Sequence, residues 1–358
     1  MSMIWSIIFS LCSCKAGIMS GNIRIMQLFK YKAGSTPSAP MLFCAPMAGV
    51  THSAFRRLLA DFGGYSAIYT ELLASRQMVH EDAGKSPYLK RRAEEGQVIY
   101  QLLLTGQDAI PEIMSSVLPL NPAAIDINCG CGGKYVRQAG GGVALFENRQ
   151  KLEKVIKDVR REYAGTLMLK IRLGHDVPGW REPFLERIRI IEDGGADAIT
   201  LHPRFAGQHM KRGARHEIFR WLADNTRLPV IANGDILGPA TIARNPHYFE
   251  KTAGIMVGRM AIICPWLFAA WDNPGLNVDH LKTWLTFYDY LLDDFGDKHA
   301  LRPLKLFTKY YAQNFAFGHT LYTATRTAST VQSLREYAVR FMSAQPAMVG
   351  PPTLPVIY

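Results

Sequence analysis

Side chains able to bind a ligand stand at the ends of short apolar runs in this sequence. Polar groups often end strands for structural reasons alone, and each of these residues has that explanation singly. A whole ring of them is costly to bury, however, unless a ligand or a hydrogen-bond network satisfies the polar atoms. The set therefore predicts a bound polar cofactor. In chain order it comprises Met47, Glu71, Gln101, Asn128, Lys170 with Arg172, His202, Asn233, and Gly258 with Arg259.

The last two apolar runs end in glycine motifs. Residues 233–235 read Asn-Gly-Asp, and residues 257–259 read Val-Gly-Arg. Tight turns would explain the glycines alone. Glycine also allows close backbone approach to a ligand, and the guanidinium of Arg259 is a planar donor of several hydrogen bonds to phosphate. The pair of motifs favours a phosphate-binding site at this end of the fold.

The elements that would position these residues are repeated strand and helix units. Segments with helical periodicity separate the runs, for example residues 53–62, 149–164 and 183–195. Parallel strands need right-handed helical crossovers, and closure of the sheet removes both edges. We therefore expect an α/β fold, a (β/α)8 TIM barrel with its active site at the carboxyl ends of the strands. The eight expected strands are residues 41–47, 66–71, 98–103, 123–128, 167–172, 197–202, 228–233 and 254–259.

An open, doubly wound sheet is the alternative, but no GxGxxG motif follows the first run and opens a helix. After Trp266 the strand pattern stops, and helical periodicity predicts a smaller, all-helical C-terminal domain. We divide the chain into a flexible N-terminal extension (1–40), the barrel (41–272), the helical domain (276–343) and a tail (344–358).

Composition is that of a folded globular protein, with 48% hydrophobic and 20% charged residues. The formal net charge of +11 suits a polyanionic partner such as nucleic acid. Residues 3–12 are apolar, yet too few to cross a bilayer. We expect a monomer without membrane association.

The cysteines fit neither a metal site nor a disulfide framework, because they lack paired CxxC spacings and a chain of this length can bury an adequate core. We expect no bound metal and a reducing, cytoplasmic location. The six cysteines are Cys12, Cys14, Cys44, Cys129, Cys131 and Cys264.

Six separated motifs resemble those of the tRNA-dihydrouridine synthases, and they occur in the order found in that family. No single motif is decisive, but the ordered set is specific and spans roughly residues 41–268. The motifs are APMAGVTHSAFR from residue 45, DINCGCGGKYV from 126, LKIRLG from 169, LHPR from 201, NGDI from 233, and VGR with PWLF from 257.

The resemblance implies FMN-dependent reduction of specific tRNA uridines to 5,6-dihydrouridine, driven by NADPH or NADH. Lys170 near N1 and O2 of the flavin would stabilise the anionic reduced ring, although a salt bridge at the barrel mouth would also explain this lysine. The residues that the resemblance assigns to FMN are Pro46, Met47, Gln101, Lys170, His202, Asn233, Asp235, Gly258 and Arg259.

The resemblance also implies that Cys131 donates a proton to C5 of the uridine. A thiol suits this task because it is protonated at neutral pH yet able to release its proton in a concerted step. The family usually has proline after this cysteine, whereas this chain has Gly132, which loosens the loop. Cys129 is a second thiol, but strand alternation points it away from the side of Asn128.

The substrate contacts follow from the same resemblance. The target uridine must leave its stack to enter the pocket, where Asn128 would bind the uracil edge. The resemblance also makes the helical domain at 276–343 an RNA-binding domain, and Arg204 and Arg302 would contact the RNA. Basic segments at 85–92 and 204–215 could flank the pocket, or they could be solvated loops.

Two other functions compete with this one. An FMN barrel that reduces a free pyrimidine, similar to dihydroorotate dehydrogenase, would share the chemistry without needing a cationic surface. The lost proline also leaves open a catalytically impaired RNA-binding relative.

Overall fold

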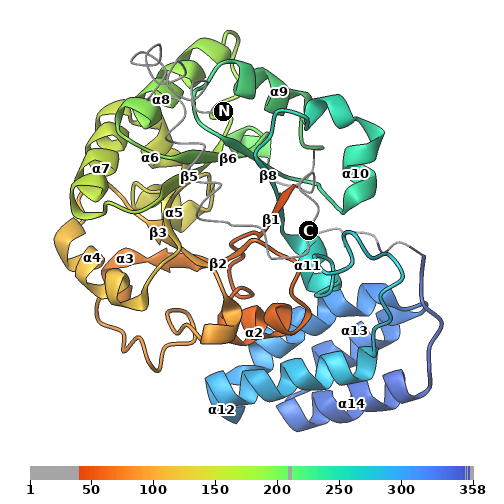
Figure 1. Cartoon of the computed structure of the whole chain (residues 1–358). Helices are drawn as coiled ribbons and strands as arrows, with labels where there is room; N and C mark the ends of the chain where they lie inside the picture. Colours follow the sequence, from red (N-terminus) through yellow and green to blue (C-terminus); the bar gives the residue numbers. More distant parts are fainter. Residues whose placement is uncertain (1–39, 209–211, 351, 353, 355–358) are drawn as a thin grey trace, which may run out of the picture.

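The computed structural model describes residues 40–208, 212–350, 352 and 354. Eight parallel strands close into a barrel in the order β1 to β8, with each strand paired to its sequence neighbours and β1 paired to β8 (Figure 1). The predicted barrel is therefore confirmed. The strands are β1 (Met41–Cys44), β2 (Ala67–Ala74), β3 (Val98–Leu103), β4 (Ala124–Cys129), β5 (Leu167–Arg172), β6 (Ala198–His202), β7 (Val230–Asn233) and β8 (Gly254–Val257).

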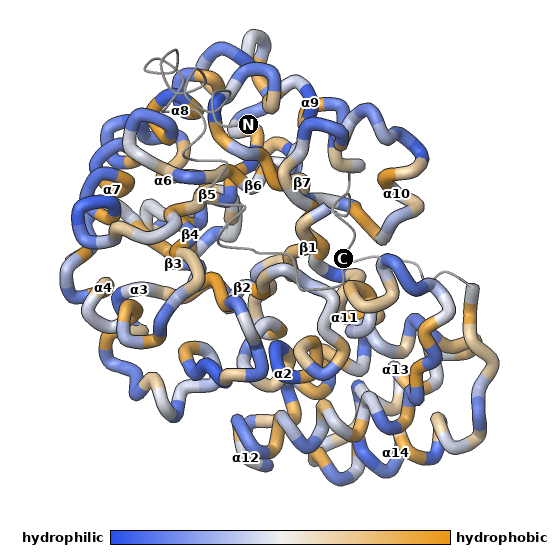
Figure 2. The backbone as a smooth tube through the Cα atoms, in the orientation of Figure 1, coloured by the Kyte–Doolittle hydropathy of each residue, from blue (hydrophilic) through white to orange (hydrophobic). Residues whose placement is uncertain are grey.

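Alternation along each strand separates two apolar layers. One small cluster fills the barrel axis with residues such as Phe43, Tyr69 and Met168. The intervening residues, such as Ile127, pack outward against the helices. Figure 2 shows apolar strands beneath helices whose outer sides are hydrophilic. Side chains at the carboxyl ends of the inward-facing rows therefore meet at one mouth of the barrel.

Helices cover the outside of the barrel. The helix predicted over residues 53–62 forms with those bounds, and Asn148 caps the predicted helix from 149 through its side-chain oxygen, which accepts from Lys151 N at 3.0 Å. The helices of this layer are α2 (Ser53–Phe62), α3 (Ser75–Met78), α4 (Ile110–Val117), α5 (Lys134–Gln138), α6 (Val143–Glu147), α7 (Arg149–Glu162), α8 (Arg181–Asp193), α9 (Glu217–Asp224), α10 (Pro239–Arg244) and α11 (Arg259–Ile263).

The predicted C-terminal helices form a bundle in which the first lies beside α2 and the other two pack against the first (Figure 1). They are α12 (His280–Tyr311), α13 (Gly318–Thr327) and α14 (Val331–Ser343). A kink divides α12 at Gly296, which has φ 63° and ψ 166°. Trp284 on α12 is fully buried, and its indole N–H donates to Thr308 Oγ1 at 3.0 Å. The buried residues of these helices belong to the same apolar cluster as the outer layer of the barrel.

Ion pairs join α12 to the barrel side. The carboxylate of Asp294 is buried and accepts from Lys90 at 3.1 Å and from Arg92 at 2.9 Å. Its neighbour Asp293 accepts from Arg57 at 2.7 Å. Because the partners are far apart in the sequence, these ion pairs connect the barrel to the C-terminal helices.

The segment after α14 returns across the end of α12. Phe315 and Met348 form an isolated antiparallel bridge, and Val349 N donates to Asn314 O at 3.0 Å. Residues 1–39 of the extension expected at 1–40, with Cys12 and Cys14, lie outside the described residues. Within the described part of the chain, no helix combines the length and apolar character that crossing a membrane requires.

Candidate active site

A chain of side-chain amides runs across the mouth of the barrel from β3 to β4. Gln101 Nε2 donates to Asp126 Oδ2 at 2.7 Å, and Asn128 Nδ2 donates to Gln101 Oε1 at 2.8 Å. Asn128 Oδ1 then accepts from the backbone N–H groups of Gly130 at 3.3 Å and Cys131 at 2.9 Å. Two predicted site residues, Gln101 and Asn128, are thus linked directly to the loop that carries Cys131.

The Cys131 loop is held from both sides. Val143 N donates to the carbonyl oxygen of Cys131 at 3.1 Å. Cys131 is partly exposed, whereas the other cysteines of the described chain are buried. Cys129 packs in the outer apolar layer, as strand alternation predicted. Of these thiols, Cys131 is the one placed to meet a molecule at the barrel mouth.

Lys170 faces the same mouth from β5, where it pairs in register with Asn128. Burial, followed by the charge of Arg172, lowers the pKa of the Lys170 ammonium to about 8, while Asp126 and Cys131 oppose the shift. Burial raises the pKa of Asp126 to about 7, against a hydrogen bond from Gln101 and the charge of Lys170. An ammonium and a carboxylate whose pKa values approach each other can both respond to a bound anionic group.

A second network surrounds Asp235 at the end of β7. One guanidinium N–H group of Arg204 donates a hydrogen bond to Asp235, and another donates to His202 Nε2 at an N–N distance of 2.8 Å. Arg259 NH2 donates to Asp235 Oδ1 at 3.1 Å. An arginine can only donate, so Nε2 of His202 accepts and its proton sits on Nδ1. Burial, followed by the charges of Lys170 and other cations, holds the pKa of His202 well below its ordinary value, so the ring is neutral.

The sequence predicts that Asp235 and Arg204 each contact a ligand, whereas in this network the two side chains bind each other. The Asp235 carboxylate orients the guanidinium groups of Arg204 and Arg259. The Arg204 side chain is 2% exposed and also donates to Arg212 O at 2.6 Å. Direct contact between Arg204 and RNA stays a prediction.

A cavity of about 160 Å³ opens between β7 and β8. Gly234, with φ 110°, brings its backbone against His202, and a Cβ there would lie 2.6 Å from that imidazole. Backbone and cationic groups therefore converge here, as phosphate binding requires. The predicted cofactor residues among its lining are Pro46, Met47, Lys170, His202, Asn233, Asp235, Gly258 and Arg259. Gln101 lies across the mouth in the amide chain, outside this lining set.

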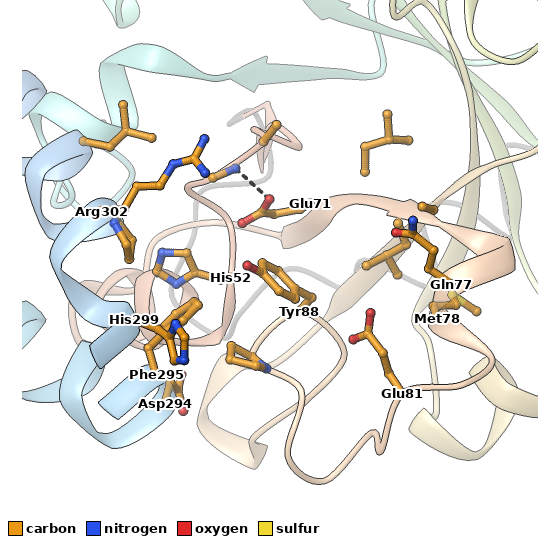
Figure 3. A pocket seen from close by; sticks show the side chains of 18 of the residues that line it. His52, Glu71, Gln77, Met78, Glu81, Tyr88, Asp294, Phe295, His299 and Arg302 are labelled. Carbon is orange, nitrogen blue, oxygen red and sulfur yellow. Dashed lines mark hydrogen bonds between the residues drawn. The ribbon is translucent and has the colours of Figure 1, made fainter. Parts of the chain in front are cut away.

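A larger cavity of about 1190 Å³ lies between the barrel mouth and α12 (Figure 3). Exposed cations on α12 line one side, including the predicted substrate residue Arg302. Glu71 from β2 reaches into the other side and accepts from Gly49 N at 2.6 Å (Figure 3). Burial raises the pKa of this carboxyl to about 7, opposed by that backbone hydrogen bond and by Arg56.

His52 and Tyr88 line the same cavity. Tyr88 belongs to the predicted basic segment 85–92, whereas sequence reasoning did not single out His52. His52 is buried among the aromatic rings of Phe287 and Phe295, and its Nδ1 has no hydrogen-bond partner among the described residues. A backbone hydrogen bond from Ser53 N to Pro87 O at 2.8 Å joins the segments that carry His52 and Tyr88, and α12 closes the other side of the cavity. For Asp126 a signal did exist, because a carboxylate interrupts an otherwise apolar strand.

Most cations of the basic segment at 85–92 bind other groups of the protein itself. Lys90 and Arg92 bind the aspartates of α12, and Arg91 donates to Gly96 O at 2.8 Å. Tyr88 is 39% exposed and faces the large cavity. Within the described residues, no group of three or more His, Cys, Asp or Glu side chains is arranged to hold a metal.

The sequence from 43 to 342 matches the family described as dihydrouridine synthase (Dus). The chain belongs to the dihydrouridine synthase family. This confirms the resemblance recognised from the motifs, and it makes the chain an oxidoreductase of that family.

Individual dihydrouridine synthases resemble the chain over most of its length. A probable tRNA-dihydrouridine synthase of Rhodobacter capsulatus is 33% identical over 313 residues, covering 83% of this chain and 94% of the relative. One from Rickettsia conorii is 30% identical over 281 residues, covering 74% and 82% respectively. The tRNA-dihydrouridine synthase B of Vibrio vulnificus is 26% identical over 323 residues, covering 86% and 98%.

Among solved structures, the old yellow enzyme of Trypanosoma cruzi superposes with a TM-score of 0.51 at 10% identity. The match covers 72% of this chain and 93% of that enzyme. A homologue from Zymomonas mobilis gives a TM-score of 0.50 at 11% identity, covering 72% and 96%. At such identities the likeness shows the barrel fold alone.

Proposed function

We propose that this dihydrouridine synthase binds FMN, accepts reducing equivalents from NADPH or NADH, and reduces the C5=C6 bond of specific uridines in tRNA. The observation that carries the proposal is the placement of Cys131. Its thiol is partly exposed at the carboxyl end of β4, and Asn128 anchors its backbone beside Lys170. A positioned proton donor next to a cofactor cavity is what reduction of a carbon–carbon double bond requires.

The residues present fit FMN. The cavity between β7 and β8 combines the backbone of Gly234 and Gly258 with the guanidinium of Arg259, which together suit a phosphate. Neutral His202 offers its Nδ1–H to the cofactor, and Lys170 and Gln101 supply polar contacts for the ring edge. Bound FMN would supply the hydride for C6.

The chain's own groups have separate tasks in this reaction. Cys131 gives a proton to C5, so its thiol must approach the base from the side opposite the flavin. Lys170 would stabilise negative charge on the reduced cofactor, and its lowered pKa reflects the burial that would make this interaction strong. Asn128 keeps the thiol in reach by holding the backbone of Cys131.

The large cavity beside α12 supports RNA as the substrate. Its α12 side presents exposed Lys298, His299 and Arg302, which suit phosphates. Tyr88 offers an aromatic face for an unstacked base. The relatives named tRNA-dihydrouridine synthases lead us to tRNA in particular.

The test uses purified protein, FMN, NADPH and an unmodified tRNA transcript. We expect a yellow protein that oxidises NADPH and adds the mass of two hydrogens to defined uridines. Reduction of free uracil with no effect on tRNA would instead support the free-pyrimidine reductase. A protein that binds tRNA but cannot retain FMN would support the impaired relative.

A further inference from the structure

We infer that Asp126 is a positioning residue that sets the direction of the amide chain holding the Cys131 loop. The role given to Cys131 rests on the proposed function, whereas the structural effect of Asp126 on the loop does not. Asp126 itself lies two residues before Asn128 on β4 and is fully buried inside the barrel.

The orientation of both side-chain amides follows from the carboxylate of Asp126. Burial raises the pKa of Asp126 to about 7, and the charge of the neighbouring Lys170 favours its ionised form. When ionised, the carboxylate can only accept hydrogen bonds, so the group that Gln101 turns toward it is its NH2. This leaves Gln101 Oε1 facing Asn128, which donates its own NH2 at 2.8 Å. The oxygen of Asn128 is thereby turned toward the loop, where two backbone N–H groups need an acceptor.

Reversing the first amide would reverse the second. If Gln101 presented its NH2 to Asn128, the oxygen of Asn128 would turn back toward Gln101. The NH2 of Asn128 would then face the N–H groups of Gly130 and Cys131, placing donors against donors. The loop would lose the acceptor that now lies 2.9 Å from Cys131 N.

A packing role alone does not explain a carboxylate at this position. The barrel layers around it contain apolar side chains such as Tyr69, Ile99 and Met168. Asp126 Oδ1 has no hydrogen-bond partner among the described residues. A buried carboxylate with one unpaired oxygen is costly, which indicates that its acceptor function is needed. Lys170 on the adjacent strand lessens that cost through its charge.

The experiment compares Asp126→Leu, Asp126→Asn and Thr200→Val in the FMN-loaded protein. Thr200 is a matched control because it is buried on β6, inside the same barrel and outside the amide chain. Cys12 and Cys14 are replaced by serine in every variant, and alkylation of Cys131 by iodoacetamide is followed by peptide mass analysis. Bound FMN and dihydrouridine formation are measured in parallel.

We expect Asp126→Leu to raise the alkylation rate of Cys131 and to lower kcat about a hundredfold, with little change in FMN content. Asp126→Asn should be intermediate, because an asparagine amide can present either its oxygen or its nitrogen to Gln101. Thr200→Val should match the parent protein. If Asp126→Leu does not fold, intermediate alkylation in Asp126→Asn carries the test.

Parental alkylation rates in both Asp126 variants would overturn the inference, as would an equal rise in Thr200→Val. Absence of dihydrouridine formation in the parent protein would overturn the proposed function instead. The alkylation rates would still decide whether Asp126 controls the loop.

Discussion

The carbonyl oxygen of Cys131 lies 2.3 Å from the position that a Cβ atom on Gly142 would occupy. Gly142 also has φ +58°, a conformation that other residues rarely adopt. The next residue, Val143, donates its N–H to that same carbonyl. The start of α6 can therefore approach the cysteine loop this closely because residue 142 has no side chain.

Gly142→Ala should destabilise the protein by more than about 1 kcal/mol, because strain and the clash with Cys131 O add. It should also slow dihydrouridine formation more than it lowers FMN binding. Denaturant unfolding and steady-state kinetics measure both effects. Gly275→Ala is the control, since a Cβ there has its nearest neighbour 4.0 Å away. Equal behaviour of the two variants would show that the close approach at Gly142 has no consequence.

The glycine that replaces the usual proline can be tested by restoring it. Gly132 is not among the glycines with a positive φ, and a Cβ there would meet Ala206 O at 3.3 Å. Gly132→Pro should stabilise the fold by about 0.4–1 kcal/mol by restricting the unfolded chain, while keeping activity. Thermal unfolding and dihydrouridine formation are the measurements, with Gly132→Ala for comparison. Loss of activity with proline would mean that this loop uses a different geometry from its relatives.

The Glu71 carboxyl should make stability depend on pH. Burial raises its pKa from 4.5 to about 7, so the folded protein holds this proton more tightly than the unfolded chain. The stabilisation is complete below pH 4.5 and is lost as pH rises through about 7. Across that window the unfolding free energy of the parent should fall relative to Glu71→Gln, by about 1.4 kcal/mol for each pKa unit.

Denaturant unfolding on both sides of the window checks this prediction. Glu81→Gln is the control, because Glu81 is an exposed carboxylate lining the same cavity. A difference between parent and Glu71→Gln that stays constant with pH would contradict the raised pKa.

Asp294→Asn should weaken the attachment of α12 to the barrel. Burial opposes ionisation of Asp294, but hydrogen bonds from Arg92 and Lys90 outweigh it and lower the pKa. Losing the negative charge and one of the two acceptor oxygens should cost about 1.5–3 kcal/mol of unfolding free energy while FMN content stays unchanged. Asp293→Asn should cost less than about 1 kcal/mol, since its side chain is 57% exposed. Similar losses of unfolding free energy in both variants would contradict the expected difference between buried Asp294 and exposed Asp293.

Much of the barrel could be predicted from sequence because its signals are local. Apolar runs of strand length were enough to locate all eight strands, although β1 ends at Cys44 rather than at residue 47 and β2 continues beyond Glu71 to Ala74. The roles of the site residues stay predictions. The partners of those residues were not predictable in this way. Alternation shows that Asp126 faces inward, but not that Gln101 on another strand will meet it.

The large cavity could not be predicted from the sequence, because its lining comes from segments that are far apart in the chain. Lys90 and Asp294 are 204 positions apart, and nothing local in either segment identifies the other. The cations of residues 85–92 were therefore interpreted as candidate RNA contacts, whereas the structure pairs Lys90 and Arg92 with α12. Only the packing of α12 shows which cations remain exposed toward the cavity.

The central claim, that Cys131 donates the proton, is tested most directly by Cys131→Ala in parallel with Cys129→Ala. Dihydrouridine formed in an unmodified tRNA transcript is measured by mass, together with FMN content and NADPH oxidation. The account predicts that Cys131→Ala keeps its flavin and its reduction by NADPH but forms almost no dihydrouridine, while Cys129→Ala remains active. Parental rates of dihydrouridine formation in Cys131→Ala would contradict it.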